Sequence, residues 1–165
     1  MNVVRFRRLI MLLFHVIVGV GAVAGGLGAI LSPLAPAGAS ADLLKTGPFE
    51  TFLVPGIILF TLFGLGNLAA AVWLLSHWQH IGSPGQTSGA ATNGSCLIQA
   101  YATGALGAGL MIWIVVQCLM LQMIIALHVI MFVVGVLQGL LAFWLLWELK
   151  AFPANVVQKV FSQLK

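Results

Sequence analysis

The residues that could carry chemistry in this chain are a few histidines and side-chain amides set within long apolar runs. Histidine can exchange a proton near neutral pH, and amides both donate and accept hydrogen bonds. In a membrane such residues either bond to a neighbouring helix or mark a functional site. We treat as candidate ligand-binding residues His15, Asn67, Gln117, Gln122, His128 and Gln138.

Position along the apolar runs divides these six residues into two layers. At a helical rise of about 1.5 Å per residue, three of them lie roughly 9–15 Å from the cytoplasmic ends of their runs, and three lie roughly 6–8 Å from the opposite face. Each layer could hold the helices together or line a site. The inner layer contains His15, Asn67 and Gln138, and the outer layer contains Gln117, Gln122 and His128.

Other kinds of reactive site have weaker support. His77 and His80 could share a helical face at a spacing of three, but they lack a nearby acidic or cysteine partner, so we expect no metal site. Cys96 and Cys118 are 22 residues apart on one expected helix, a separation of roughly 33 Å that excludes a disulfide between them.

The acidic residues also lie outside the apolar runs. Asp42 and Glu50 belong to a polar connection, and Glu148 stands at the end of the last run, so no catalytic triad is expected within the membrane. The chain has no phosphate-binding loop, dinucleotide fingerprint or CxxC motif. We therefore expect no cofactor and no catalytic residue.

The elements that must position these residues are membrane-spanning helices. Of 165 residues, 61% are hydrophobic and 6% are charged, whereas a soluble domain has roughly a quarter of its residues charged. A bilayer core needs about 20 apolar residues per helix. The sequence predicts a single all-α membrane domain, a four-helix transmembrane bundle with spans at about 9–31, 52–76, 97–121 and 124–148, followed by an interfacial helix at about 153–165.

Two parts of this prediction, the first span and the turn between the third and fourth spans, are less well determined by the sequence. Arg5, Arg7 and Arg8 before the first run, with Ala39-Ser40-Ala41 after it, also resemble a cleavable signal peptide, although the run is long for one. The turn between the third and fourth spans has no Gly or Pro, and Gln122 is its expected apex. The segment 77–95 is rich in Gly, Ser, Thr and Asn and is predicted to be a loop.

Basic residues predict the orientation. With four spans, the two termini and the 77–95 connection lie on one side, which carries six of the seven Lys and Arg residues, and only Lys45 lies on the other. The positive-inside rule then places both termini in the cytoplasm. The same clustering explains the net charge of +4 without nucleic acid, which we do not expect as a partner.

Helix packing is predicted from small residues. Lipid tails are as apolar as leucine, so the helices associate through close approach of small residues and through polar contacts. In the first span, Gly21, Gly25 and Ala29 recur at intervals of four and predict the face that meets a neighbouring helix.

Several short motifs resemble those of small four-span bacterial membrane proteins without assigned function. They are Gly47-Pro48-Phe49, Phe52-Leu53-Val54-Pro55-Gly56, Gly64-Leu65-Gly66-Asn67 and Trp113-Ile114-Val115-Val116-Gln117, and the resemblance covers most of 9–146. The topology is also similar to that of DoxX-type four-helix membrane proteins, some of which are linked to quinone or redox chemistry. The resemblance implies a bacterial cytoplasmic membrane and supplies no reaction.

Three functions are consistent with these features. The leading hypothesis is a non-enzymatic accessory, lipid-interacting or small-ligand-binding bundle, with the lipid bilayer as its partner and a homo-oligomer or a larger membrane complex as its assembly. The second is a small transporter or channel subunit with Asn67, Gln117 and His128 along its path. The third is a quinone- or redox-linked membrane enzyme that uses His15 or His128.

Overall fold

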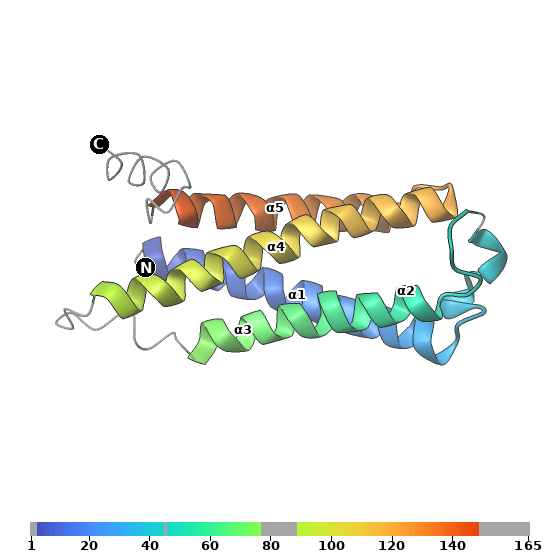
Figure 1. Cartoon of the computed structure of the whole chain (residues 1–165), viewed down its shortest axis with the longest axis horizontal. Helices are drawn as coiled ribbons and strands as arrows, with labels where there is room; N and C mark the ends of the chain where they lie inside the picture. The colour runs from blue at the N-terminus through green and yellow to red at the C-terminus, as the bar shows by residue number, and fades with distance from the viewer. Residues whose placement is uncertain (1–2, 45, 77–88, 149–165) are drawn as a thin grey trace, which may run out of the picture.

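The computed structural model describes residues 3–44, 46–76 and 89–148, and within these ranges the chain is helical apart from its connections. Four of its helical segments are long and apolar enough to cross a membrane. Together they form an all-α four-helix bundle (Figure 1). The elements are α1 (Val3–Leu31), the 3-10 turns η1 (Pro36–Gly38) and η2 (Ala41–Leu43), α2 (Leu53–Ile58), the π-helix η3 (Leu59–Leu65), α3 (Gly66–Ser76), α4 (Gly89–Leu121) and α5 (Ala126–Glu148).

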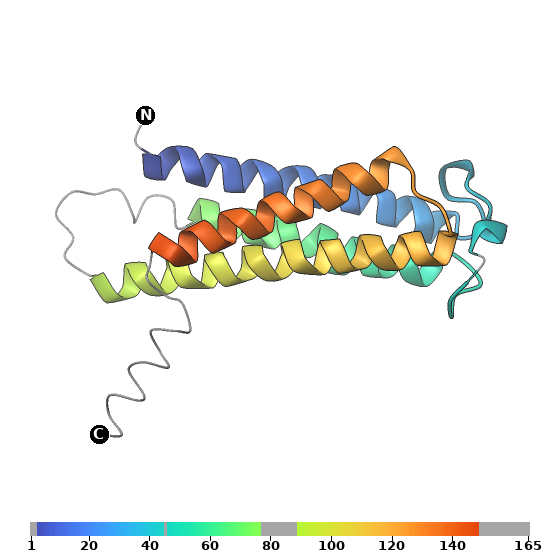
Figure 2. The same cartoon turned by 90° about the horizontal axis from the view of Figure 1, so that it is seen from above.

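The helices run alternately up and down. The start of α1, the end of α3, the start of α4 and the end of α5 lie at one end of the bundle, and the 32–52 connection and the 122–125 turn lie at the other (Figures 1 and 2). Because α2, η3 and α3 follow one another without a break, they act as the second span. The two ends of the described chain therefore lie on the same side.

The bundle consists of two antiparallel pairs. Helix α1 packs mainly on the second span, and α4 packs mainly on α5, whereas contacts between the pairs are sparser. An apolar cluster joins the pairs in the half nearer the 32–52 connection, and its buried members are Val18, Ala22, Phe63, Leu110, Trp113 and Ile114.

Close backbone approach holds the first pair together. A Cβ atom added at Gly26 would lie 2.6 Å from the backbone nitrogen of Phe60, and one at Gly64 would lie 2.8 Å from the side chain of Val23. Neither position has room for a side chain. Such contacts are typical of helix pairs in membranes.

The contacting face of α1 differs from the predicted one. Gly21 has open space where its Cβ would be, and the only close neighbour at Gly25 is a leucine side chain. The buried small residues are instead Gly19, Ala22, Gly26 and Ala29. These four residues are separated by three, four and three positions. With about 3.6 residues per turn, alternating spacings of three and four keep residues on one face of a helix, whereas a repeated spacing of four moves them gradually around the helix.

The helix boundaries show three differences from the sequence prediction. Helix α1 begins at Val3, so Arg8 is a buried residue within a helix and not part of a preceding segment. Helix α4 begins at Gly89, inside the segment predicted to be a loop, and α5 begins at Ala126. Once a helix is nucleated, each added residue gains a hydrogen bond, so extension beyond the apolar run costs little. The predicted interfacial helix at 153–165 lies outside the described residues.

The turn between α4 and α5 is formed at Gln122, which has a φ of 50°. A left-handed residue just after a helix is a common way to end it. The 32–52 connection completes this end of α4, because the Thr46 hydroxyl donates to the carbonyl oxygen of Leu119 at 2.7 Å and the Thr46 N–H donates to that of Met120. Carbonyl groups left free by the helix end are thereby bonded.

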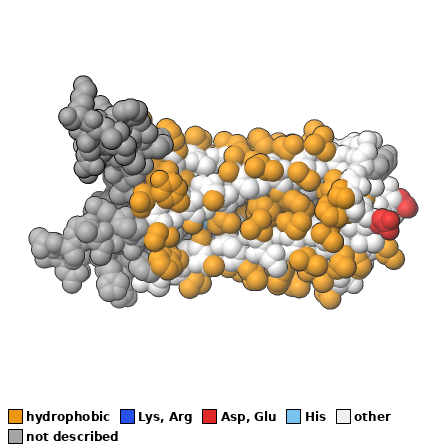
Figure 3. All heavy atoms as spheres, in the orientation of Figure 1, with side chains coloured by type: hydrophobic (Ala, Val, Ile, Leu, Met, Phe, Trp, Pro, Cys, Tyr) orange, Lys and Arg blue, Asp and Glu red, His pale blue; other side chains and the backbone are white. Residues whose placement is uncertain are grey.

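The outer surface of the bundle is apolar. Large hydrophobic side chains such as Ile17, Val72, Leu119 and Trp147 are each more than 60% exposed, and hydrophobic atoms cover the visible face between the two ends (Figure 3). Acidic side chains appear at the end that bears the 32–52 connection. An exposed apolar surface of this extent requires lipid as its solvent, so the chain is an integral membrane protein.

Candidate functional site

The structure brings the three residues of the predicted inner layer together in the centre of the bundle. His15 from α1, Asn67 from α3 and Gln138 from α5 are each fully buried. Two residues of α4, Gln99 and Thr103, join them and are at most 5% exposed. All four spans thus contribute to one polar network.

The orientation of the Asn67 amide can be deduced from one contact. Its Nδ2 atom lies 2.8 Å from the carbonyl oxygen of Phe63, and a carbonyl oxygen only accepts hydrogen bonds. The nitrogen must therefore face Phe63, and Oδ1 faces the neighbouring helices. There it accepts hydrogen bonds from His15 Nδ1 at 2.8 Å and from Gln138 Nε2 at 3.0 Å.

The bond from Asn67 to the Phe63 carbonyl lies at the end of the π-helix η3. At its end, the Gly66 N–H donates to the carbonyl oxygens of Thr61, five residues back, and of Phe63. The usual bond in an α-helix reaches four residues back. This irregular pattern accompanies the side-chain bond from Asn67 to Phe63, and π-helical turns are often found at functional sites.

The tautomer of His15 follows from the amide orientation. Because Asn67 Oδ1 accepts, His15 Nδ1 carries the proton that it donates. In the neutral ring Nε2 is then an acceptor, and the Thr103 hydroxyl lies 3.0 Å from it. Thr103 donates to this nitrogen and accepts from Gln99 Nε2 at 3.4 Å. Both ring nitrogens of His15 are thereby bonded within the protein.

The direction of these bonds limits the chemistry of the network. Donation runs from Gln99 through Thr103 to His15 and then to Asn67, whereas Gln138 donates to Asn67 from the other side. Donors therefore converge on Asn67 Oδ1. A chain that relays protons needs each member to donate onward, and this amide oxygen has no proton to pass on. The network is arranged to hold helices rather than to conduct protons.

The network also joins the two helix pairs. His15 and Asn67 belong to the pair of α1 with the second span, and Thr103 and Gln138 belong to the pair of α4 with α5. Hydrogen bonds between membrane helices contribute about 0.6–2 kcal/mol each. Three such bonds cross between the pairs, from Thr103 to His15, from Gln138 to Asn67 and, at 3.4 Å, from Gln99 to His15. They add to contacts that are sparser between the pairs than within them.

The predicted outer layer does not assemble. Gln122 is exposed in the turn, Gln117 is half-buried, and no hydrogen bond links either of them to His128 in the described chain. His128 is buried at the start of α5, where its Nδ1 accepts the N–H of Ile125 at 3.4 Å. Ile125 directly precedes α5, and His128 is the third residue of that helix. A bond from the N–H of the preceding residue to the side chain at the third position is one half of a capping box, so His128 stabilises the start of the helix.

These positions separate the residues of the predicted transport path. Asn67 contacts Gln138, which is ten residues after His128 on α5, a distance of roughly 15 Å along the axis. Asn67, Gln117 and His128 therefore do not form one continuous polar line within a single copy of the chain.

Two buried polar atoms have no hydrogen-bond partner in the part of the chain that the structure describes. They are Gln138 Oε1, on the side of the amide that faces away from Asn67, and Trp113 Nε1, whose ring packs against Phe63 at a centroid distance of 6.2 Å. Within the described ranges, no three His, Cys, Asp or Glu residues are close enough to hold a metal ion.

Gln99 and Thr103 were not predicted as members of the site. One signal was available, since residues four apart share a helical face. A glutamine and a threonine in that register can meet one polar neighbour.

Comparison of the chain with protein-family models, with curated proteins and with solved structures gives no match.

Proposed function

We propose that the chain is a non-enzymatic, lipid-interacting accessory protein of a bacterial cytoplasmic membrane, in which the buried polar residues clamp the helices together. The observation that supports this best is the bonding of His15. Both of its ring nitrogens bond to other side chains, Asn67 and Thr103, so neither is free to bind a metal, a quinone or a substrate. A catalytic histidine needs a nitrogen that faces its reactant.

The lipid-interacting part of the proposal is supported by the surface. The hollows found between α4 and α5 have apolar linings, and exposed apolar side chains cover all four spans. A ligand for this protein is therefore expected to be apolar and to reach it through the bilayer.

The orientation belongs to the same proposal. The described ends of α1 and α5 lie at one end of the bundle (Figure 1), and six of the seven basic residues belong to the segments on that side. We infer that both termini face the cytoplasm. The bacterial setting is supported only by the resemblance to small four-span bacterial proteins.

The experiment that tests the absence of catalysis is purification followed by spectroscopy. The protein is extracted in a mild detergent, its absorbance from 300 to 700 nm (about the range in which redox cofactors absorb) is recorded, and quinol oxidation is assayed. We expect no bound chromophore and no turnover. A cofactor that copurifies with the wild type and is lost in His15→Ala, but retained in His128→Ala, would overturn the proposal.

A further inference from the structure

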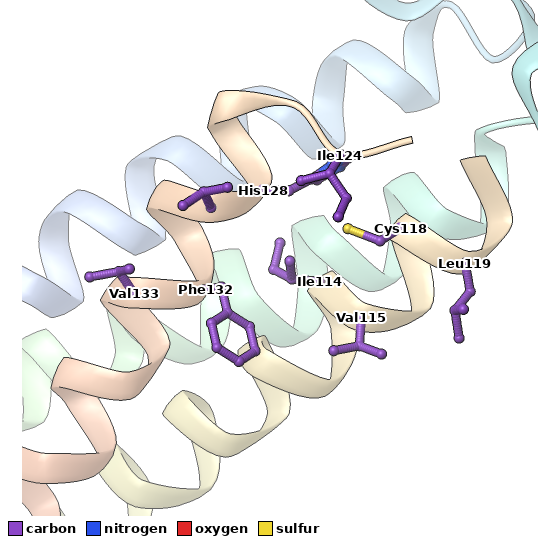
Figure 4. A pocket seen from close by; sticks show the side chains of 9 residues that line it. Ile114, Val115, Cys118, Leu119, Ile124, His128, Phe132 and Val133 are labelled. Carbon is purple, nitrogen blue, oxygen red and sulfur yellow. The ribbon is translucent and has the colours of Figure 1, made fainter. Parts of the chain in front are cut away.

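We propose that one acyl chain of a membrane lipid occupies a groove between α4 and α5, in the half of the bundle nearer the 122–125 turn. This inference rests on the lipid-interacting part of the proposed function and assigns it a place. The groove has a volume of about 320 Å³, and its lining includes Ile114, Val115, Cys118, His128, Phe132 and Val133 (Figure 4).

The groove lies where a lipid chain is the available ligand. Its lining residues belong to the apolar stretches of α4 and α5 and to Ile124 in the turn, and several of them are exposed on the outer surface of the bundle. The surrounding solvent at this depth is hydrocarbon. A water-soluble ligand would have to cross that layer to reach the groove.

The groove offers a ligand no nitrogen or oxygen atom, and its one sulfur, in the thiol of Cys118, is only a weak hydrogen-bonding group. His128 contributes carbon atoms to the lining, and its Nδ1 is turned to the N–H of Ile125. An occupant with a buried polar group would leave that group without a strong hydrogen-bond partner, which is unfavourable. Pure hydrocarbon carries no such penalty.

The groove also runs in the direction of a lipid chain. A second hollow of about 240 Å³ is lined by Met111, Ile112 and Val116, and it shares Val115 and Phe132 with the first. The two hollows therefore follow α4 from Leu119 to Met111, a length of roughly 12 Å parallel to the helix axis. Lipid chains lie along the same direction.

The size of the groove favours a chain over a helix. A helix with its side chains is about 10 Å across. The volumes that hold small ligands are about 300–1,000 Å³, and the first hollow is at the lower end of this range while the second is below it. A second copy of this chain could insert single side chains only. The expected occupant is therefore a flexible hydrocarbon chain whose headgroup lies beyond the turn.

The test uses the full-length protein in vesicles of phosphatidylcholine that contain a small fraction of the same lipid with a diazirine in one acyl chain. After illumination, labelled peptides are mapped by mass spectrometry. Val133→Trp fills the groove, and Leu140→Trp is the matched control, because Leu140 is exposed on the same face of α5 two turns away and does not line either hollow.

We expect the wild type to be labelled about tenfold more at residues 114–119 and 128–133 than around Leu140, the ratio that corresponds to ~1.4 kcal/mol of preference. Val133→Trp should remove this excess, and Leu140→Trp should leave it unchanged. The two variants are comparable because both place a tryptophan at a lipid-exposed position. Circular dichroism shows whether each variant is folded. If one of them is not, the labelling pattern of the wild type alone decides whether the groove holds a lipid chain.

Uniform labelling of exposed residues in the wild type would overturn the inference, as would an excess that Val133→Trp leaves intact in a folded protein. Native mass spectrometry of the same samples shows whether a dimer forms. A dimer that is lost in Val133→Trp would assign the groove to a second copy instead. None of these outcomes bears on catalysis. The proposal that His15 holds the helices together is tested separately, by the spectroscopy and the quinol assay described above.

Discussion

At the residue scale, the polar core depends on the orientation of a single amide. Asn67 donates to the Phe63 carbonyl and accepts from two helices, so its oxygen is the point where His15 and Gln138 meet. Removing it leaves two donors buried without a partner. The cost of an unpaired buried donor exceeds the value of the bond itself, which makes this position more sensitive than its neighbours.

Replacing Asn67 with leucine tests this dependence. We expect Asn67→Leu to lower the free energy of unfolding by about 2 kcal/mol, because two bonds between helices are lost and two donors stay buried. Unfolding with sodium dodecyl sulfate in mixed micelles, followed by circular dichroism, measures the change. The control is Gln117→Leu, since Gln117 is half-buried and outside the network, and it should change the free energy by less than about 0.5 kcal/mol.

The tautomer of His15 is a second prediction at this scale. The bonding deduced above places the proton on Nδ1 and leaves Nε2 as the acceptor for Thr103. Long-range proton–nitrogen correlation spectra of protein labelled with ¹⁵N-histidine distinguish the two forms, and the His15→Gln variant assigns the signal among the four histidines. A ring protonated on Nε2 alone would contradict the deduced orientation of Asn67.

The sequence could indicate which polar residues reach the membrane interior but not which of them meet. Counting residues placed His15, Asn67 and Gln138 at similar depths, and they lie together. The same count grouped Gln122 with His128, yet one lies in the turn and the other caps a helix. Depth follows from the helix rise, whereas the direction of a side chain depends on helix rotation, which packing determines.

At the element scale, the pairing of α1 with the second span depends on glycines that allow backbones to meet. Span ends at Leu31 and Leu121 were readable from the apolar runs. The π-helix η3 was not, because no residue type in 59–65 marks a change of hydrogen-bond register. The packing face of α1 was also misplaced, since glycine is abundant along this helix and only some of its glycines lie against a neighbour.

Two glycines of α1 provide a matched comparison of packing. We expect Gly26→Ala to lower the free energy of unfolding by about 1–3 kcal/mol, because the added methyl would lie 2.6 Å from the Phe60 backbone, and that backbone would have to move. Gly28→Ala meets open space and should be neutral or stabilising by up to about 1 kcal/mol, given the higher helix propensity of alanine. The same denaturant titration compares them, and equal effects would contradict the close approach.

At the scale of the whole molecule, the fold is two helix pairs joined by two apolar clusters and one polar network. One cluster lies nearer the 32–52 connection, and the second, which contains Met11, Leu74, Ala100 and Leu145, lies nearer the end where α1 begins. The polar network lies between the two clusters. Contacts at three levels along the bundle oppose rotation of one pair against the other. All of the apolar surface outside them is left for lipid, and the orientation of the bundle in the bilayer must then come from its charges.

That orientation can be measured with two cysteine variants in a background that lacks Cys96 and Cys118. Ser40 is exposed in the 32–52 connection, and Ser76 is exposed at the opposite end of the bundle. Because the sequence predicts six of the seven basic residues on the side of the two termini, which is also the side of Ser76, the positive-inside rule predicts that Ser40 lies outside the cell. A maleimide that cannot cross membranes should label Ser40→Cys in intact cells and Ser76→Cys only after permeabilisation. The reverse pattern would place both termini outside and would show that Lys45 and the acidic residues of the outer connection outweigh the basic ends.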